Sequence, residues 1–392
     1  MTDLPRFIAE LVNNWPWLCV FFAFGLGAII GSLVNVCIYR MPLEKSILWP
    51  GSRCGSCLSK IRFFPDNIPI FSYWWLGGKC RVCGARFSPR YFWIEFLVGF
   101  VFALLFYLLV ILEAERLDRS DLWIRDIGGL WDKRRVQAQT WQLLLVWLYH
   151  AAFAALLIVA TFTDIDHWEI PYAITIPGTI IAIVFGTLGP WPWPIDPEAV
   201  SNLIPGWDRG RLVFGGLGLI EESVHLVPSG MQRWPVFLPA PEWLRSGTWQ
   251  MGLATSLVGA AVGNLGMRLI RVIFSWGLKK EAMGLGDADL MMMIGAFLGW
   301  QALIFVLGFG VALGLLYAIV LVVRNQGNEL PFGPFLAGGA LLALLTPWWV
   351  YYLLQRFFFD LPLVLVLGGL SAVLALCLTL SIRMAKLIWE AV

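Results

Sequence analysis

Long apolar segments separated by short charged segments dominate the chain. Apolar runs begin near residues 17, 92, 141, 172 and 251, and a nearly continuous apolar region follows from 288 to the C-terminal part. Most of these runs are close to the roughly 20 residues that an α-helix needs to cross the hydrocarbon core of a bilayer. The pattern therefore predicts an all-α polytopic membrane protein with about nine transmembrane helices.

The bounds of the predicted spans follow from these runs. The run from Ala288 to Val323 is too long for one span, and we expect a break near Gly299-Trp300. The predicted spans are 17–39, 92–112, 141–162, 172–188 and 251–274, one on each side of the break at Gly299, and then 335–352 and 361–381.

Lysine and arginine are distributed unevenly among the loops. Residues 41–91 carry eight of them against two acids, Glu44 and Asp66, and such an excess marks the cytoplasmic side of a membrane. By alternation of the spans, residues 113–139 and the Pro- and Trp-rich residues 189–250 lie outside. The predicted parts are a first span (1–40), a small cytoplasmic domain (41–91), spans two to four (92–188), an extracytoplasmic insertion (189–250) and spans five to nine (251–392).

Composition supports the membrane assignment and adds little about partners. The chain is 59% hydrophobic and 14% charged, and its formal net charge of +2 gives no sign of nucleic-acid binding. A lipid bilayer is the expected partner, and no nucleic acid is expected. The first apolar run lacks a basic leader and a small-residue cleavage site, so it is expected to be a retained helix rather than a signal peptide.

Four of the seven cysteines form two CxxC pairs, Cys54/Cys57 and Cys80/Cys83, separated by about 22 residues. Each pair can place two thiolates on one ion, and two pairs complete a tetrahedral zinc site. In a reducing cytoplasm zinc is favoured over disulfides; a redox dithiol and a chance spacing are the alternatives. Four cysteine ligands leave no open coordination position, so the predicted Zn²⁺ is structural rather than catalytic.

Two acidic residues lie at predicted helix ends. Asp164 follows the third span, and Asp287 follows Gly284-Leu285-Gly286 shortly before the sixth. An ionisable residue at the edge of a membrane helix is costly unless it is paired or functional. The two glycines remove side-chain bulk beside Asp287, so a second backbone could approach it. Asp164 lies closest to its apolar segment and is expected to be buried.

Topology alone brings both acids to the cytoplasmic boundary, on different helices. The polar neighbours of Asp164, namely Asp166, His167 and Glu169, are interpreted as interfacial caps or solvated charges. Two carboxylates in such positions fit an aspartic peptidase, and they equally fit the proton or cation relay of a transporter. A zinc-dependent docking scaffold with inert acids is a third hypothesis.

Several short stretches add specificity when they are taken together. They are Gly31–Pro42, the two CxxC pairs enclosing Asp66–Tyr73, Arg90–Glu95, Asp164–Pro171, Gly284–Asp287 and Pro331–Pro334. In this order they resemble the bacterial type IV prepilin leader peptidases, which are membrane aspartic proteases of the GxGD kind. The resemblance covers most of the chain, except the two outside loops and the ninth span.

The resemblance implies that Asp164 and Asp287 are the catalytic pair. It also implies a prepilin or pseudopilin substrate, with a short basic leader and a hydrophobic helix, that is cut on the cytoplasmic side of the bacterial inner membrane. Many family members then methylate the new N-terminal amine with S-adenosylmethionine, so this activity is implied too; the residues that would bind this cofactor are unknown.

One residue departs from the family pattern. Two positions after the GxGD aspartate, where the family usually has lysine, this chain has Asp289. An extra acid that faces the site would raise the pKa values of its neighbours, whereas one that points to water would have little effect. The sequence leaves both outcomes open.

Overall fold

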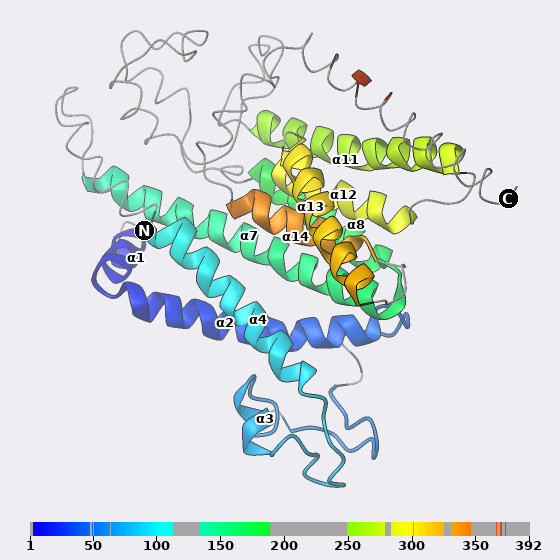
Figure 1. The fold of residues 1–392 in the computed structure, drawn as a ribbon. Helices are drawn as coiled ribbons and strands as arrows, with labels where there is room; N and C mark the ends of the chain where they lie inside the picture. The colour runs from blue at the N-terminus through cyan, green and yellow to red at the C-terminus, as the bar shows by residue number, and fades with distance from the viewer. Residues whose placement is uncertain are drawn as a thin grey trace, which may run out of the picture. The chain divides into compact units, whose positions relative to one another are not determined.

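A computed structural model describes most of the chain. The described residues are 3–47, 49, 51–62, 64–112, 133–188, 249–278, 284–300, 302–324 and 331–345, together with 366, 369, 370 and 373. The chain divides into two compact units, Met1–Pro171 (unit 1) and Tyr172–Val392 (unit 2). Within the described residues every named element is a helix (Figure 1), which confirms the predicted all-α class.

Five helices in the described part are long and apolar enough to cross a membrane, and they confirm a multi-pass membrane protein. They are α2 (Pro16–Arg40), α4 (Arg90–Phe106) with its π-helical continuation η1 (Tyr107–Ile111), most of α7 (Lys133–His167), α11 (Trp249–Leu278) and α13 (Ala302–Val323). Three further helices are apolar and shorter, namely α8 (Tyr172–Leu188), α12 (Leu285–Leu298) and α14 (Gly333–Leu345). Most of the ninth predicted span lies outside the described residues, so the total of nine stays a prediction.

The apolar pattern located these helices closely, with one informative difference. The break between α12 and α13 falls at Gly299, as predicted, where a φ of 81° favours glycine. The third predicted span ends at Phe162, whereas α7 continues to His167. The polar Thr163 does not end the helix because its hydroxyl bonds within it, 2.9 Å from the carbonyl oxygen of Val159. The acid motif therefore lies inside the last turn of α7.

Close packing of backbones joins α2 to α4 in unit 1. A Cβ atom at Gly31 would overlap the backbone of Glu95, and one at Gly27 would overlap the side chain of Phe102. Small residues allow helix axes to approach in a membrane, where burial of apolar area does not drive helix association. Gly27 and Gly31 are thus packing positions.

Aromatic and polar contacts at their ends show that α2 and α4 run antiparallel. Trp17 near the start of α2 stacks on Tyr107 of η1, with ring centroids 5.8 Å apart. At the other end of α2, the side chain of Asn35 donates to the carbonyl oxygen of Tyr91 in α4 at 3.0 Å. The loop segment between them, residues 41–89, is called the Cys-rich segment below; it contains the short helix α3 (Phe71–Trp75).

Two helices of unit 1 were not predicted from the sequence. The helix α1 (Asp3–Asn14) is amphipathic rather than uniformly apolar, and it packs against α2 and α7. The helix α3 has five residues, fewer than a periodic pattern needs to be recognised.

In unit 2, α8, α11 and α12 pack on one another. A Cβ atom at Gly259 would overlap the carbonyl oxygen of Gly295, and one at Gly263 would overlap the carbonyl oxygen of Met291. This pair of glycines, four residues apart, therefore forms the contact face between α11 and α12, as its spacing predicts. The helix α14 packs mainly against α13.

Candidate active site and metal centre

Four cysteine side chains come together in the Cys-rich segment. The Sγ atoms of Cys54, Cys57, Cys80 and Cys83 all lie within 4.8 Å of one another. Cys54 Sγ is 3.8 Å from Cys83 Sγ, and Cys57 Sγ is 4.0 Å from Cys80 Sγ. Sulfurs bound to one tetrahedral zinc at ~2.3 Å are about 3.8 Å apart, whereas a disulfide needs about 2.05 Å. The arrangement fits a metal site rather than two disulfides.

Two similar turns build this cluster. The N–H of Leu58 donates to the carbonyl oxygen of Cys54 at 3.0 Å, and the N–H of Gly84 donates to that of Cys80 at 2.9 Å. Both residues that follow the second cysteine of a pair are left-handed, with φ of 57° at Leu58 and 71° at Gly84. Glycine adopts this conformation without strain, which accounts for Gly84 but leaves Leu58 strained.

The thiols of the cluster differ in acidity. The backbone N–H groups of Cys83 and Val82 bond the sulfur of Cys80 and lower its pKa to about 6. The N–H of Ala85 lowers the pKa of Cys83, but the neighbouring thiols, that of Cys57 foremost, outweigh it and raise this pKa to about 12. Crowded sulfurs therefore resist full deprotonation by themselves, and a divalent cation would favour the thiolate form of all four.

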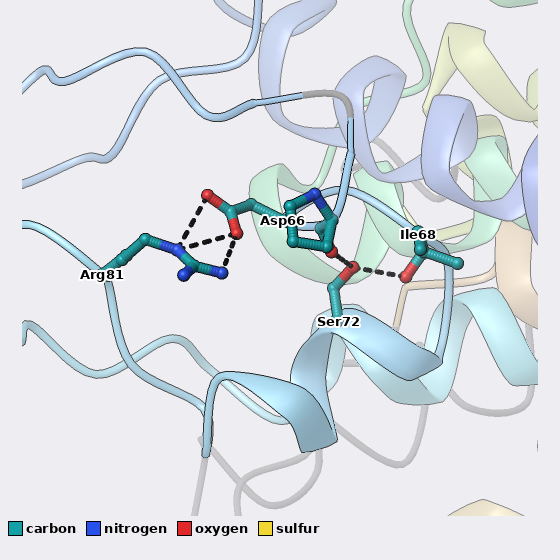
Figure 2. Close-up of polar contacts among 5 residues, drawn as sticks. Asp66, Ile68, Ser72 and Arg81 are labelled. Atoms are coloured by element: carbon teal, nitrogen blue, oxygen red, sulfur yellow. Dashed lines mark hydrogen bonds and ion pairs between the residues drawn. The ribbon is translucent and has the colours of Figure 1, made fainter.

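A polar network braces the chain between the two turns (Figure 2). Arg81, which lies between the second pair of cysteines, binds Asp66, with its Nε and Nη2 atoms 2.9 Å and 2.5 Å from Oδ1. The hydroxyl of Ser72 lies 2.6 Å from the carbonyl oxygen of Ile68 and 3.2 Å from that of Pro65. These contacts tie the Asp66–Tyr73 stretch to the second turn.

The first acid motif occupies the last turn of α7. Asp164 is buried, with 7% of its surface exposed, as the sequence predicts. The N–H of Trp168 makes the last helical hydrogen bond, 2.9 Å from the carbonyl oxygen of Asp164, and the left-handed conformation of Trp168 ends the helix. Trp168 has a φ of 58°, a left-handed conformation that costs a non-glycine residue about 1–2 kcal/mol. The chain therefore leaves the helix directly after the acids.

Arg90, the first residue of α4, binds the second acid of this motif. Its Nη1 and Nη2 atoms lie 2.9 Å and 2.6 Å from the two carboxylate oxygens of Asp166. Its guanidinium carbon lies 5.0 Å from the ring centroid of Phe162. This contact was not predicted from the sequence. Asp166 is exposed, as expected, but it is the bidentate partner of an arginine from another helix rather than a solvated charge. In the sequence, the feature that pointed to a role for Arg90 was the Arg90–Glu95 stretch, one of those that carry the family resemblance.

Glu95 joins α4 to the Cys-rich segment. Its Oε2 atom accepts the backbone N–H of Ile70 at 2.7 Å. Ile70 has a φ of 67°, and the N–H of Phe71 donates across it to the carbonyl oxygen of Pro69 at 2.7 Å. This is the strained three-residue γ-turn, rare for a β-branched residue. A carboxylate on a membrane-spanning helix thus holds the turn that leads into α3.

The second acid lies in the first turn of α12. Asp287 is buried, with 8% of its surface exposed, in a turn where the helix dipole favours a negative charge. Gly284 precedes the helix with φ −70° and ψ 156°, a conformation open to any residue. Among the described residues, a Cβ atom there would meet only the nitrogen of Gly286, at 3.9 Å. The approach of a second backbone to Asp287 stays a prediction.

Asp289 faces α11 and not water. Only 5% of its surface is exposed, and its Oδ1 accepts the side-chain N–H of Asn264 at 3.0 Å. Arg268 Nη2 lies 3.9 Å from the same oxygen. The possibility that Asp289 points to water is therefore wrong. A positive charge still lies beside α12, although it comes from α11 rather than from residue 289.

The structure thus brings together the four predicted metal ligands, and it buries both predicted acids at helix ends. Asp164 belongs to unit 1 and Asp287 to unit 2. Their pairing therefore stays a prediction that rests on the sequence.

Two family models match the chain. Residues 26–109 match the bacterial Peptidase A24 N-terminal domain, which covers most of α2, the Cys-rich segment, α4 and part of η1. Residues 236–319 match the type IV leader peptidase family, which covers α11, α12 and most of α13. A membrane-embedded peptidase is the class of protein that these regions define. The two matched regions are similar to those of type IV leader peptidases.

Several curated proteins resemble the chain, and each carries the name prepilin leader peptidase/N-methyltransferase. The protein of Myxococcus xanthus is 29% identical over 304 residues, which are 78% of this chain and 63% of that protein. The protein of Aeromonas salmonicida strain A449 is 26% identical over 86% of this chain and 94% of its own length. The protein of Pectobacterium carotovorum is 27% identical over 88% and 98%. No solved structure matches the chain.

Proposed function

We propose that this protein removes the leader peptide of type IV prepilins or pseudopilins on the cytoplasmic side of the bacterial inner membrane, and then methylates the new N-terminal amine. The observation that carries the proposal is the match of residues 236–319 to the type IV leader peptidase family, because it contains Asp287, a buried acid at the start of a membrane helix. The names of the relatives support both activities.

Asp164 and Asp287 are the proposed catalytic acids. Asp164 lies outside both matched regions, so its role rests on the resemblance of Asp164–Pro171 and on its burial in the last turn of α7. The cytoplasmic location of both acids rests on the excess of Lys and Arg in residues 41–91 and on the alternation of spans.

The proposed reaction needs two carboxylates that share one proton, because two close carboxylates do not both ionise readily. One carboxylate takes a proton from a water molecule, whose oxygen attacks the scissile carbonyl carbon. The other donates a proton to the carbonyl oxygen. The first carboxyl group then gives the proton it took from water to the amide nitrogen, and the second takes back a proton from a hydroxyl of the tetrahedral intermediate, so that the C–N bond breaks and an acid and an amine are released. The two roles belong to the coupled pair rather than to either residue.

The cysteine cluster has a structural role in this proposal. Cys54, Cys57, Cys80 and Cys83 would hold Zn²⁺, and the sulfur separations of 3.8 Å and 4.0 Å fit that ion. Bound zinc links the two turns of a segment too small to stabilise itself by a core. S-adenosylmethionine supplies the methyl group for the second activity.

A transporter that uses the two acids as an ion relay is less favoured, because the named relatives are all peptidases and methyltransferases. The proposed function is tested by co-expression with a type IV prepilin and mass spectrometry of the pilin. We expect the leader to be lost and one methyl group to be added. Recovery of only the full-length precursor would contradict the peptidase assignment, and a cleaved but unmethylated pilin would contradict the second activity alone.

A further inference from the structure

The helix α3 presents an apolar face that the described part of the chain leaves uncovered. Phe71, Trp74 and Trp75 are 71%, 70% and 73% exposed. Their spacing of three and four residues places them on one side of the helix. Three large aromatic side chains grouped in this way are unusual on a water-facing surface.

Ring contacts fix α3 against the start of a membrane-spanning helix. The ring centroids of Tyr73 and Trp74 lie 5.8 Å and 5.7 Å from that of Phe92, in the first turn of α4. Glu95, one turn further along α4, holds the turn before α3 through the N–H of Ile70. Figure 1 shows α3 below the first turns of α4. The exposed face of α3 is therefore held at the level where α4 enters the apolar layer.

The charges near α3 complement an anionic surface. Lys79 and Arg86 are exposed, and their backbones pair in an isolated bridge whose first residue lies four positions after the end of α3. Arg81 does not contribute in the same way because Asp66 neutralises it. Aromatic rings beside exposed cations are the composition typical of segments that lie in the headgroup region of a membrane.

We propose that α3 anchors the Cys-rich segment to the bilayer. Phe71, Trp74 and Trp75 insert between the headgroups, and Lys79 and Arg86 contact anionic lipid phosphates. The bilayer, rather than a protein, is assigned as the partner of this face because ring contacts and a hydrogen bond hold α3 against the start of the membrane-spanning helix α4. This anchor holds the metal-binding segment against the membrane surface, and it does not depend on the proposed peptidase activity.

Photo-crosslinking in the full-length protein tests this assignment. A benzophenone amino acid replaces Trp75 in one variant and, as the control, the equally exposed Val82, at 71% on the second cysteine turn, in another. Both proteins are placed in nanodiscs of phosphatidylethanolamine and phosphatidylglycerol, and mass spectrometry identifies the adducts. We expect lipid adducts at position 75 to exceed those at position 82 by about tenfold.

Equal lipid yields at the two positions, or adducts at position 75 with residues 172–392 of the same chain, would overturn the proposal. A second measurement separates an anchor from a folding defect. Phe71→Ser combined with Trp75→Ser, which leaves the contact of Trp74 with Phe92 in place, is expected to retain bound metal and to increase hydrogen exchange in residues 64–79, whereas Trp49→Ser, at a residue 79% exposed outside α3, is expected to change neither. Unchanged exchange in the double variant would also contradict the anchor.

Discussion

At the scale of single residues, Asp164 and Asp166 of the first motif have different surroundings in unit 1. Asp166 is the bidentate partner of Arg90, so its charge is compensated within the protein. Asp164 is buried two residues earlier. The ion pair holds the last turn of α7 against the first turn of α4, and this is where the proposed catalytic acid lies.

We expect Arg90→Gln to reduce prepilin cleavage about fivefold, because Asp166 loses its partner and the end of α7 is less firmly held; a partly exposed pair contributes about 1 kcal/mol or less. The measurement is kcat and KM on a purified prepilin. The matched control is Arg81→Gln, which removes a similar bidentate pair with Asp66 away from α7.

Exchanging the charges, with Arg90→Asp and Asp166→Arg together, is expected to recover part of the lost kcat. Equal kcat values for Arg90→Gln and the native enzyme would show that the pair does not position the motif.

Asp289 supports a prediction about stability. Asp289→Lys introduces the residue usual in the family, but here it would place a buried cation against Arg268, 3.9 Å from the present carboxylate. We expect destabilisation of about 3 kcal/mol or more, because the charge is buried without a partner. Thermal unfolding in detergent measures it. Adding Arg268→Asp is expected to restore stability. If the Asp289→Lys variant has the same unfolding temperature as the native protein, the interaction between Asp289 and Arg268 does not contribute to stability.

At the scale of elements, glycine packing holds the helix that carries Asp287. The contact between α11 and α12 depends on Gly263, where a Cβ atom would overlap the carbonyl oxygen of Met291. Gly266 lies three residues later on the same helix, and a Cβ atom there would meet no described atom within 4 Å outside its own helix backbone. The same substitution at the two sites should therefore have opposite effects.

Gly263→Ala is expected to lower stability by about 1–3 kcal/mol, because α11 and α12 must separate to admit the methyl group. Gly266→Ala is expected to be neutral or to stabilise by up to about 1 kcal/mol through helix propensity. Thermal unfolding of both variants in one detergent makes the comparison. Equal loss of stability in both would mean that the close contact at Gly263 does not matter.

The cysteine turns give a second prediction at this scale. Cys80→Ser is expected to abolish binding of one zinc ion per chain and to expose the Cys-rich segment to trypsin, because three ligands no longer complete the site. Cys19→Ser, at a buried cysteine of α2, is the control and should retain the metal. Elemental analysis of the purified proteins measures the metal, and full zinc occupancy in Cys80→Ser would rule out the four-cysteine site.

At the scale of the whole molecule, apolar run length and CxxC spacing predict much of the fold and the metal cluster. Both depend on local sequence: α8 coincides with residues 172–188, and the break at Gly299 follows from the length of the run. Contacts between distant segments were not predictable. Arg90 with Asp166 and Asp289 with Arg268 depend on helix packing, which a single sequence does not specify. The short helix α3 was missed because five residues carry too little periodicity.

The central claim is that Asp164 and Asp287 together cleave a prepilin. The most direct measurement is prepilin cleavage by purified Asp164→Asn and Asp287→Asn variants in lipid, compared with Asp166→Asn, each checked for bound zinc and for unchanged unfolding temperature. Each of the first two is expected to lose cleavage by about 10³-fold or more, because an amide cannot share or transfer the proton, while Asp166→Asn retains measurable cleavage. Native-like cleavage by either Asp164→Asn or Asp287→Asn would contradict the claim.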